Sequence, residues 1–159
     1  MESGSLTFDT NHWPLVLMTL GESLSDDSVG QIAAFFHTVH VRKELFALLV
    51  DTTRIKEVPS ATWRRDLTDW TGKQDVQENS KKYNLGTAVV LSSAFARGAF
   101  VAIGWLWKPA SPVRGFATAA EAVDWCSDQL VRGGVARSPN LFALQRSLHE
   151  APKPRSSAR

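Results

Sequence analysis

The stretch "LFALLVD", Leu45 to Asp51, decides the fold class that we expect for this chain. Six apolar residues follow one another without interruption, and an acidic residue ends the run. Such a run is typical of a strand buried on both faces of a parallel sheet. We therefore expect a sheet that is covered by helices.

The sequence before this run indicates two strands and a helix. Residues 5–20 form two apolar segments around the turn residues "DTNH", a pattern that predicts a hairpin. Residues 25–44 follow with Val29, Ile32 and Phe36 among apolar residues at helical spacing. This period predicts an amphipathic helix between the hairpin and the apolar run.

The sequence after the run indicates a second helix and then a polar segment. Ser60 stands where an N-cap is expected, and Trp63, Leu67 and Trp70 mark the buried face of that helix. Residues 71–84 are polar and contain a glycine. We expect a frayed helix end or a mobile loop there.

Two further strands and a last helix complete the expected order. The run "LGTAVVLSS", residues 85–93, indicates a buried strand, and residues 113–116 a short one. A helix then begins after Thr118, with Glu121 at the spacing of a capping box. The order ββαβαβαβα predicts an α/β fold: a mostly parallel five-stranded sheet with an N-terminal hairpin, flanked by four helices.

Between these strands, "SSAFARGAFVAIGWLW" (Ser92 to Trp107) is the most apolar stretch of the chain. A spanning helix needs about 20 apolar residues, and this stretch is shorter and contains Arg97. We expect a core helix, with Gly98 and Ala102 on a small-residue face toward the sheet or another helix. Its large side chains cannot all share that face, so one side is expected to meet a partner or a second copy.

The expected domain spans residues 1–131, and residues 132–159 hold a linker, a short amphipathic segment and a disordered basic tail. From Arg132 onward the chain has six basic residues and one acidic residue, whereas the part before it has twelve basic and fifteen acidic residues. A basic tail can contact nucleic acid or anionic lipid, but we favour a solvated end.

The composition favours a reducing compartment. Cys126 is the one cysteine of the sequence, so no intrachain disulfide can form. The segment "MESGSLTFD" at the start has neither a basic region nor an apolar core and does not resemble a signal peptide. We expect a cytoplasmic location.

Three runs carry a resemblance to a known family: "LLVDTTRIKEVPSATWRRDLTDW" (48–70), "GTAVVLSSAFARGAFVAIGWLW" (86–107) and "VRGFATAAEAVDW" (113–125). With the expected strand order, they resemble the SpoIIAA-like group of the STAS superfamily, over about Leu15 to Leu130. This resemblance implies an anti-sigma-factor-antagonist fold, related to CRAL-TRIO lipid-binding domains. It implies a regulatory module that binds proteins or, in some branches, lipids.

One departure from that family concerns its phosphorylated serine. Signalling STAS domains carry an Asp-Ser-Ser-Gly-like turn, and here the turn is "VPSATW", with Ala61 at the matched serine and Thr62 at the glycine. We interpret Ser60 as an N-cap. Phosphorylation of Ser60 or Thr62 remains an alternative, since a helix N-terminus favours phosphate.

The sequence contains no GxSxG motif, no Walker motif and no GxGxxG motif. His37, His40 and Glu44 lie on one face if the helix continues to residue 44, and such a face can bind metal. We favour a solvated polar face and expect no metal site, no cofactor and no enzymatic activity.

Polar residues follow two of the expected strands. Asp51 and Thr53 end one strand, and Ser92 and Ser93 end the other, with Arg97 one helical turn later. Ligands of open α/β folds bind at this edge of the sheet. Ser92, Ser93 and Arg97 are therefore a possible anion site, although these residues also suit loop and helix caps.

We expect a non-enzymatic interaction module that binds a protein partner or a second copy, and no nucleic acid. A lipid or membrane surface is the alternative, and a phospho-regulated switch is another. The proposed contact residues have apolar side chains and lie either on the apolar helix expected after Ser93 or on the short amphipathic segment near the C-terminus: Phe95, Phe100, Trp107, Leu141, Leu144 and Leu148.

Overall fold

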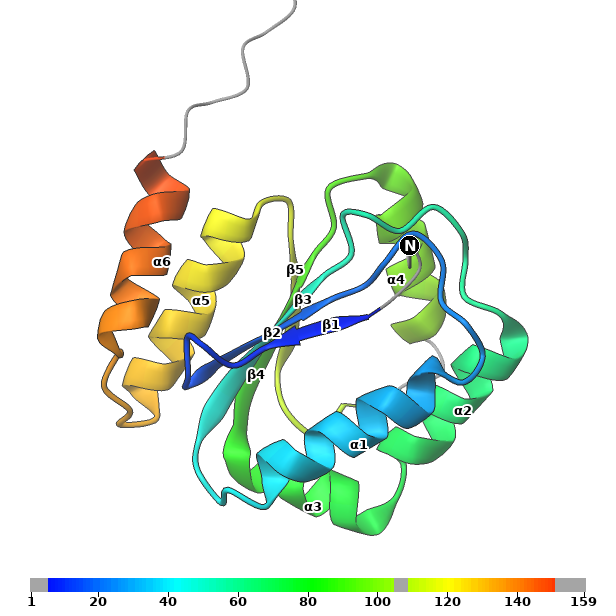
Figure 1. The fold of residues 1–159 in the computed structure, drawn as a ribbon, viewed down its shortest axis with the longest axis horizontal. Helices are drawn as coiled ribbons and strands as arrows, with labels where there is room; N and C mark the ends of the chain where they lie inside the picture. Colours follow the sequence, from blue (N-terminus) through cyan, green and yellow to red (C-terminus); the bar gives the residue numbers. More distant parts are fainter. Residues whose placement is uncertain (1–5, 105–108, 151–159) are drawn as a thin grey trace, which may run out of the picture.

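The computed structural model describes residues 6–104 and 109–150, and for residues 102–104 it describes the backbone alone. A five-stranded sheet runs through the middle, with helices on both of its faces (Figure 1). The strands are β1 (Thr7–Asp9), β2 (Leu15–Thr19), β3 (Phe46–Asp51), β4 (Asn84–Val90) and β5 (Val113–Phe116). The helices are α1 (Ser28–His40), α2 (Ala61–Thr71), α3 (Gln74–Tyr83), α4 (Ala94–Gly104), α5 (Ala119–Arg132) and α6 (Pro139–Glu150).

The strands lie side by side in the order of the sequence, β1-β2-β3-β4-β5. β1 and β2 form the expected hairpin and are antiparallel, whereas the other three neighbouring pairs are parallel. The α/β class and the five strands are thus confirmed. The sheet is mixed, which corrects the expectation of a mostly parallel one, because the short β1–β2 connection permits only an antiparallel pair.

The described part of the chain holds six helices, so the expected number of four is wrong. One extra helix is α3, where we expected a frayed end or a loop. Asp75 lies in its first turn and Lys81 and Lys82 in its last, which suits the helix dipole. The side chain of Gln74 also donates to Glu78 one turn later, at 3.0 Å. These local interactions stabilise a helix that has little apolar content.

The other extra helix is α6, in the segment that we separated from the domain. Pro139 occupies its first position, where the fixed φ of proline suits a helix. The side chain of Ser138 accepts a hydrogen bond from the N–H of Leu141 at 3.2 Å and so caps the helix. The observed element order is therefore ββαβααβαβαα.

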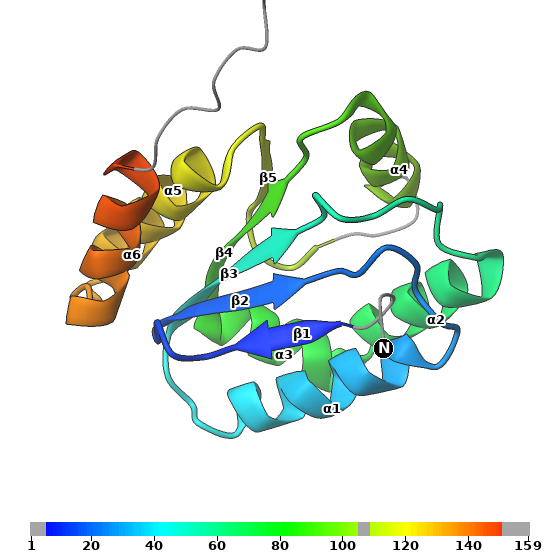
Figure 2. The same ribbon diagram turned by 45° about the horizontal axis from the view of Figure 1, so that its top comes forward.

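β3 is buried on both faces, as its sequence predicts. Leu48 belongs to the apolar cluster that α1 and α2 cover, and Leu49 belongs to the cluster that α5 and α6 cover. Figure 2 shows α4 apart from both groups, beyond the carboxyl end of β4. The sheet therefore separates two distinct apolar layers.

Three side chains cap helices as expected. The hydroxyl of Ser60 accepts from the N–H of Trp63 at 3.0 Å. The hydroxyl of Ser93 accepts from Ala96 at 3.0 Å, and that of Thr118 accepts from Glu121 at 3.3 Å. Each bond satisfies an amide at a helix start that has no partner within the helix.

We expect Ser60→Ala to lower the free energy of unfolding by about 1 kcal/mol, because the cap of α2 is lost. Ser60 also donates to the carboxylate of Asp26, which joins α2 to the segment before α1. Urea denaturation measures the change. Ser60→Thr keeps a capping hydroxyl and serves as the control, and an equal loss in both variants would contradict the capping role.

Candidate ligand-binding pocket

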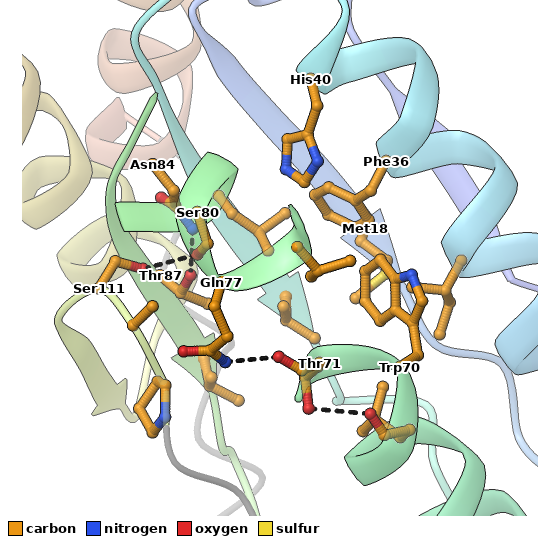
Figure 3. A pocket seen from close by; sticks show the side chains of 18 of the residues that line it. Met18, Phe36, His40, Trp70, Thr71, Gln77, Ser80, Asn84, Thr87 and Ser111 are labelled. Atoms are coloured by element: carbon orange, nitrogen blue, oxygen red, sulfur yellow. Dashed lines mark hydrogen bonds between the residues drawn. The ribbon is translucent and has the colours of Figure 1, made fainter. Parts of the chain in front are cut away.

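A cavity of about 170 Å³ lies between the sheet and the helices α1, α2 and α3 (Figure 3). Side chains of β2, β3 and β4 form its floor, among them Met18, Leu48 and Thr87. The cavity exists because α3 covers this part of the sheet with short or polar side chains. Val76 and Ser80 line it, and no residue of α3 is fully buried.

Aromatic rings form one wall of the cavity. Phe36 comes from α1, and Trp63 and Trp70 come from α2. The rings of Phe36 and Trp70 lie 5.8 Å apart at 44°. The indole N–H of Trp63 donates to the hydroxyl of Ser28 at 2.7 Å. This bond satisfies the polar atom of the indole, so Trp63 contributes an apolar surface to the cavity.

Polar side chains gather on the opposite side, as Figure 3 shows for Gln77, Ser80, Thr87 and Ser111. The hydroxyl of Thr87 accepts from the amide of Asn84 at 3.0 Å. The hydroxyls of Ser80 and Ser111 lie 3.4 Å apart, which is long for a bond between hydroxyls. The cavity thus has an apolar wall from α1 and α2 and a polar wall from α3, β4 and residue 111.

His40 is the only ionisable side chain among the described residues that line the cavity. Its ring lies 5.9 Å from that of Phe36 and 6.3 Å from that of Phe46. Burial lowers the pKa of His40, the charge of Asp75 opposes this effect, and His37 adds to it. The environment therefore favours a neutral imidazole.

We expect the stability to fall as the pH is lowered through the ordinary pKa of histidine, about 6.5. The pKa of His40 is lowered in the folded protein, so the unfolded chain takes up this proton first. The loss stops below the folded-state pKa, where both states are protonated. Thermal melts between pH 8 and pH 5 measure the slope. His40→Gln is expected to flatten it, and an unchanged slope would contradict this role.

The expected face of His37, His40 and Glu44 does not form. α1 ends at His40, and Glu44 lies four residues beyond it. His37 and Glu44 are exposed, whereas His40 lines the cavity. In the described ranges, no three His, Cys, Asp or Glu residues are placed to hold a metal ion.

The possible anion site at the end of β4 consists of exposed side chains. Ser92, Ser93 and Arg97 are all exposed, and Ser93 is engaged as the cap of α4. Asp51 accepts from the N–H of Thr53 at 2.8 Å and closes a local turn. These contacts are the loop and helix caps that we weighed against anion binding.

Ser60 and Thr62 stand at the start of α2. The hydroxyl of Ser60 contacts both the N–H of Trp63 and the carboxylate of Asp26. A phosphate on Ser60 would lie beside a carboxylate and would lose the donated hydrogen bond. This environment favours the capping interpretation over a switch.

The proposed contact residues fall into three groups. On α4, Phe95 is 43% exposed, as expected for a contact residue on a free surface. Phe100 instead lines the cavity. Trp107 lies outside the described residues. Of the expected small-residue face, Gly98 is exposed, which corrects that part of the prediction, and the side chain of Ala102 lies outside the described residues. Ala96 of α4 is buried.

The apolar face of α6 is packed inside this chain, which corrects its assignment to a partner. Leu141 is fully buried in the cluster that contains Leu130 of α5. Leu144 and Leu148 pack against the same cluster. Asp124 of α5 also contacts His149 of α6 at 2.7 Å. The short amphipathic segment thus covers the core of its own chain.

Sequence reasoning missed the cavity and found no converging polar groups. The sequence feature that could have indicated the cavity is the composition of residues 74–83, which hold one valine and several polar residues directly before the apolar strand β4. In the structure this helix has no buried residue, and the space between it and the sheet stays open. Gln77 and Ser80 were not identified for this reason, whereas His40 was considered only as a metal ligand and Thr87 only as part of a buried strand.

Within the described ranges, every helix is too short or too polar to cross a membrane. Comparison with protein-family models, curated proteins and solved structures gave no match. The geometry of the cavity is therefore the basis for a functional proposal.

Proposed function

We propose that this chain is a binding module that takes up a small, largely apolar molecule in the cavity beneath α2 and α3. The observation that carries the proposal is an apolar cavity with a few polar groups on one side, the usual composition of small-molecule sites. It develops the lipid-binding alternative that the CRAL-TRIO relationship implies.

The size of the cavity restricts the ligand. An engineered protein cavity of about 150 Å³ takes up benzene, and the cavity here has about 170 Å³. The ligand is accordingly one aromatic ring or a short alkyl chain. A long acyl chain would require α3 to move away from the sheet.

The proposal is one of binding rather than catalysis. His40 is the only ionisable group among the described lining residues, and aromatic rings stand beside it. General acid–base catalysis needs a titrating group within hydrogen-bond reach of a reacting atom. The hydrogen bonds of the cavity wall join side chains to one another and to main-chain carbonyls, as in a structural lining.

Titration calorimetry with toluene tests the proposal. Toluene is expected to bind the wild-type chain and to raise its melting temperature. Val76→Phe places a larger side chain at the cavity wall and is expected to abolish binding. Val131→Phe makes the same change at an exposed position of α5 and is the matched control.

Two outcomes of this experiment would refute binding in the cavity. One is the absence of heat and of a melting shift with the wild-type chain. The other is equal toluene binding by Val76→Phe and Val131→Phe, which would place the toluene elsewhere.

Self-association through α4 is a second candidate function. Phe95 is 43% exposed and Val101 is 57% exposed on this helix, and a contact with a second copy of the chain would cover these apolar side chains. Sedimentation velocity at increasing concentration is expected to show a dimer. Val101→Lys is expected to remove that dimer, and a monomer at all concentrations would exclude the candidate.

A further inference from the structure

We infer that the cavity selects uncharged ligands that carry a hydroxyl group at one end of a single ring or short chain, and that it excludes carboxylates of the same size. The inference rests on the proposed binding function. It specifies which chemical class of small molecule the site takes.

The first argument is the absence of a positive charge in the described lining. No Lys or Arg side chain lines the cavity there, and His40 stands between aromatic rings. A carboxylate that enters such a site loses its hydration without gaining a cation, which costs far more than burying a hydroxyl. Burial also lowers the pKa of His40, so the imidazole does not supply the charge at neutral pH.

The second argument is the spare hydrogen-bonding capacity of the polar wall. The hydroxyl oxygen of Thr87 accepts from Asn84, so its own proton is left to donate. The side-chain nitrogen of Gln77 donates to the carbonyl of Thr71, and its oxygen accepts no hydrogen bond from the described residues. The wall therefore includes one free donor, the hydroxyl of Thr87, and one free acceptor, the side-chain oxygen of Gln77.

A hydroxyl group fits this pair of functions because it donates one hydrogen bond and accepts others. A carboxylate only accepts and would leave the oxygen of Gln77 facing another acceptor. A hydrocarbon would leave both groups without a partner. The long contact between Ser80 and Ser111 adds two hydroxyls that can turn toward a ligand.

The third argument is the separation of the two walls. Figure 3 shows Met18, Phe36 and Trp70 on the side away from Gln77 and Thr87. A ring that lies against the aromatic wall places a substituent at its far end next to the polar wall. The cavity thus orients a molecule with one apolar end and one polar end.

A matched series of three probes tests this selection on the wild-type chain: toluene, p-cresol and 4-methylbenzoate, at pH 8. They share a methyl-substituted ring and differ at the opposite position, which holds hydrogen, hydroxyl or carboxylate. We expect p-cresol to bind roughly twofold to tenfold tighter than toluene, the factor that one net hydrogen bond supplies. We expect 4-methylbenzoate to bind at least about tenfold more weakly than p-cresol, because its charge is buried without a partner.

Variants at position 87 test whether the polar wall produces the preference for p-cresol over toluene. Thr87→Val removes the hydroxyl and keeps the shape, and it is expected to bring the ratio of p-cresol to toluene affinity close to one. Thr87→Ser restores a hydroxyl and is expected to restore the preference. Ser147→Ala, at an exposed position of α6, is the control and is expected to keep the wild-type ratio.

The outcomes distinguish a failure of the proposed selection for a hydroxyl group from a failure of the proposed binding function. Equal binding of toluene and p-cresol, or 4-methylbenzoate as tight as p-cresol, would overturn the selection and leave binding itself supported. Failure of both uncharged probes to bind would overturn the binding function and the selection together. If Thr87→Val does not fold, the three affinities of the wild-type chain still decide the inference.

Discussion

Trp63→Ala is expected to lower the free energy of unfolding by about 3–5 kcal/mol, the range for removing a large aromatic side chain from a core. Trp63 is 3% exposed and is the one fully buried residue of α2. It also joins α2 to the start of α1 through its bond to Ser28. The substitution removes both the volume of the indole and its hydrogen bond, and both losses weaken the contact between α1 and α2.

Two milder variants separate these contributions. Trp63→Phe keeps an aromatic ring and loses the N–H, and Ser28→Ala removes the acceptor. If the bond matters, the two changes combine less than additively in a double-mutant cycle. Urea denaturation followed by circular dichroism measures all variants. A loss below about 1 kcal/mol for Trp63→Ala would show that α2 is not held through this residue.

Leu141→Ala is expected to lower the free energy of unfolding by about 2–5 kcal/mol. Leu141 is fully buried among residues of β3, β4 and α5, although it lies beyond the boundary at residue 131 that we expected from the sequence. The substitution leaves a space in the layer that these elements share. The whole domain is therefore expected to unfold at lower urea concentration in a single transition.

The neighbouring residue supplies the control for α6. Phe142 is 45% exposed on the same helix, so Phe142→Ala is expected to change the stability by less than about 1 kcal/mol. If Leu141→Ala has as small an effect as Phe142→Ala, α6 is an appendage and the boundary at residue 131 stands.

Features that depend on neighbouring residues in the chain were predictable from the sequence. The run from Leu45 to Asp51 is apolar at every position before the acid, and the structure shows it buried on both faces. Ser60 and Thr118 cap helices because a cap is a contact over three residues. The period of residues 25–44 also predicts α1, although the helix stops at His40.

Features that depend on distant contacts were not predictable in this way. The apolar face of α6 is visible in the sequence, but the sequence does not say whether α5 or another protein covers it. α3 forms from charges and local bonds, which we interpreted as the mark of a loop. The cavity depends on how α3 packs against β4 and against its neighbours α1 and α2, and the contacts between α1 and α3 join residues that are distant in the sequence.

The helices that cover the sheet also differ in how many of their residues are buried, which bears on hydrogen exchange. α1 and α5 have five buried residues each, whereas α2 has one and α3 has none. Segments with few buried contacts open while the rest of a protein stays folded. Amide protons of α3 are therefore expected to exchange through a partial opening, far faster than those of β3, β4 and α5. The same opening admits a ligand to the cavity, so a bound molecule slows exchange in α3 and leaves the protection of α5 as it was.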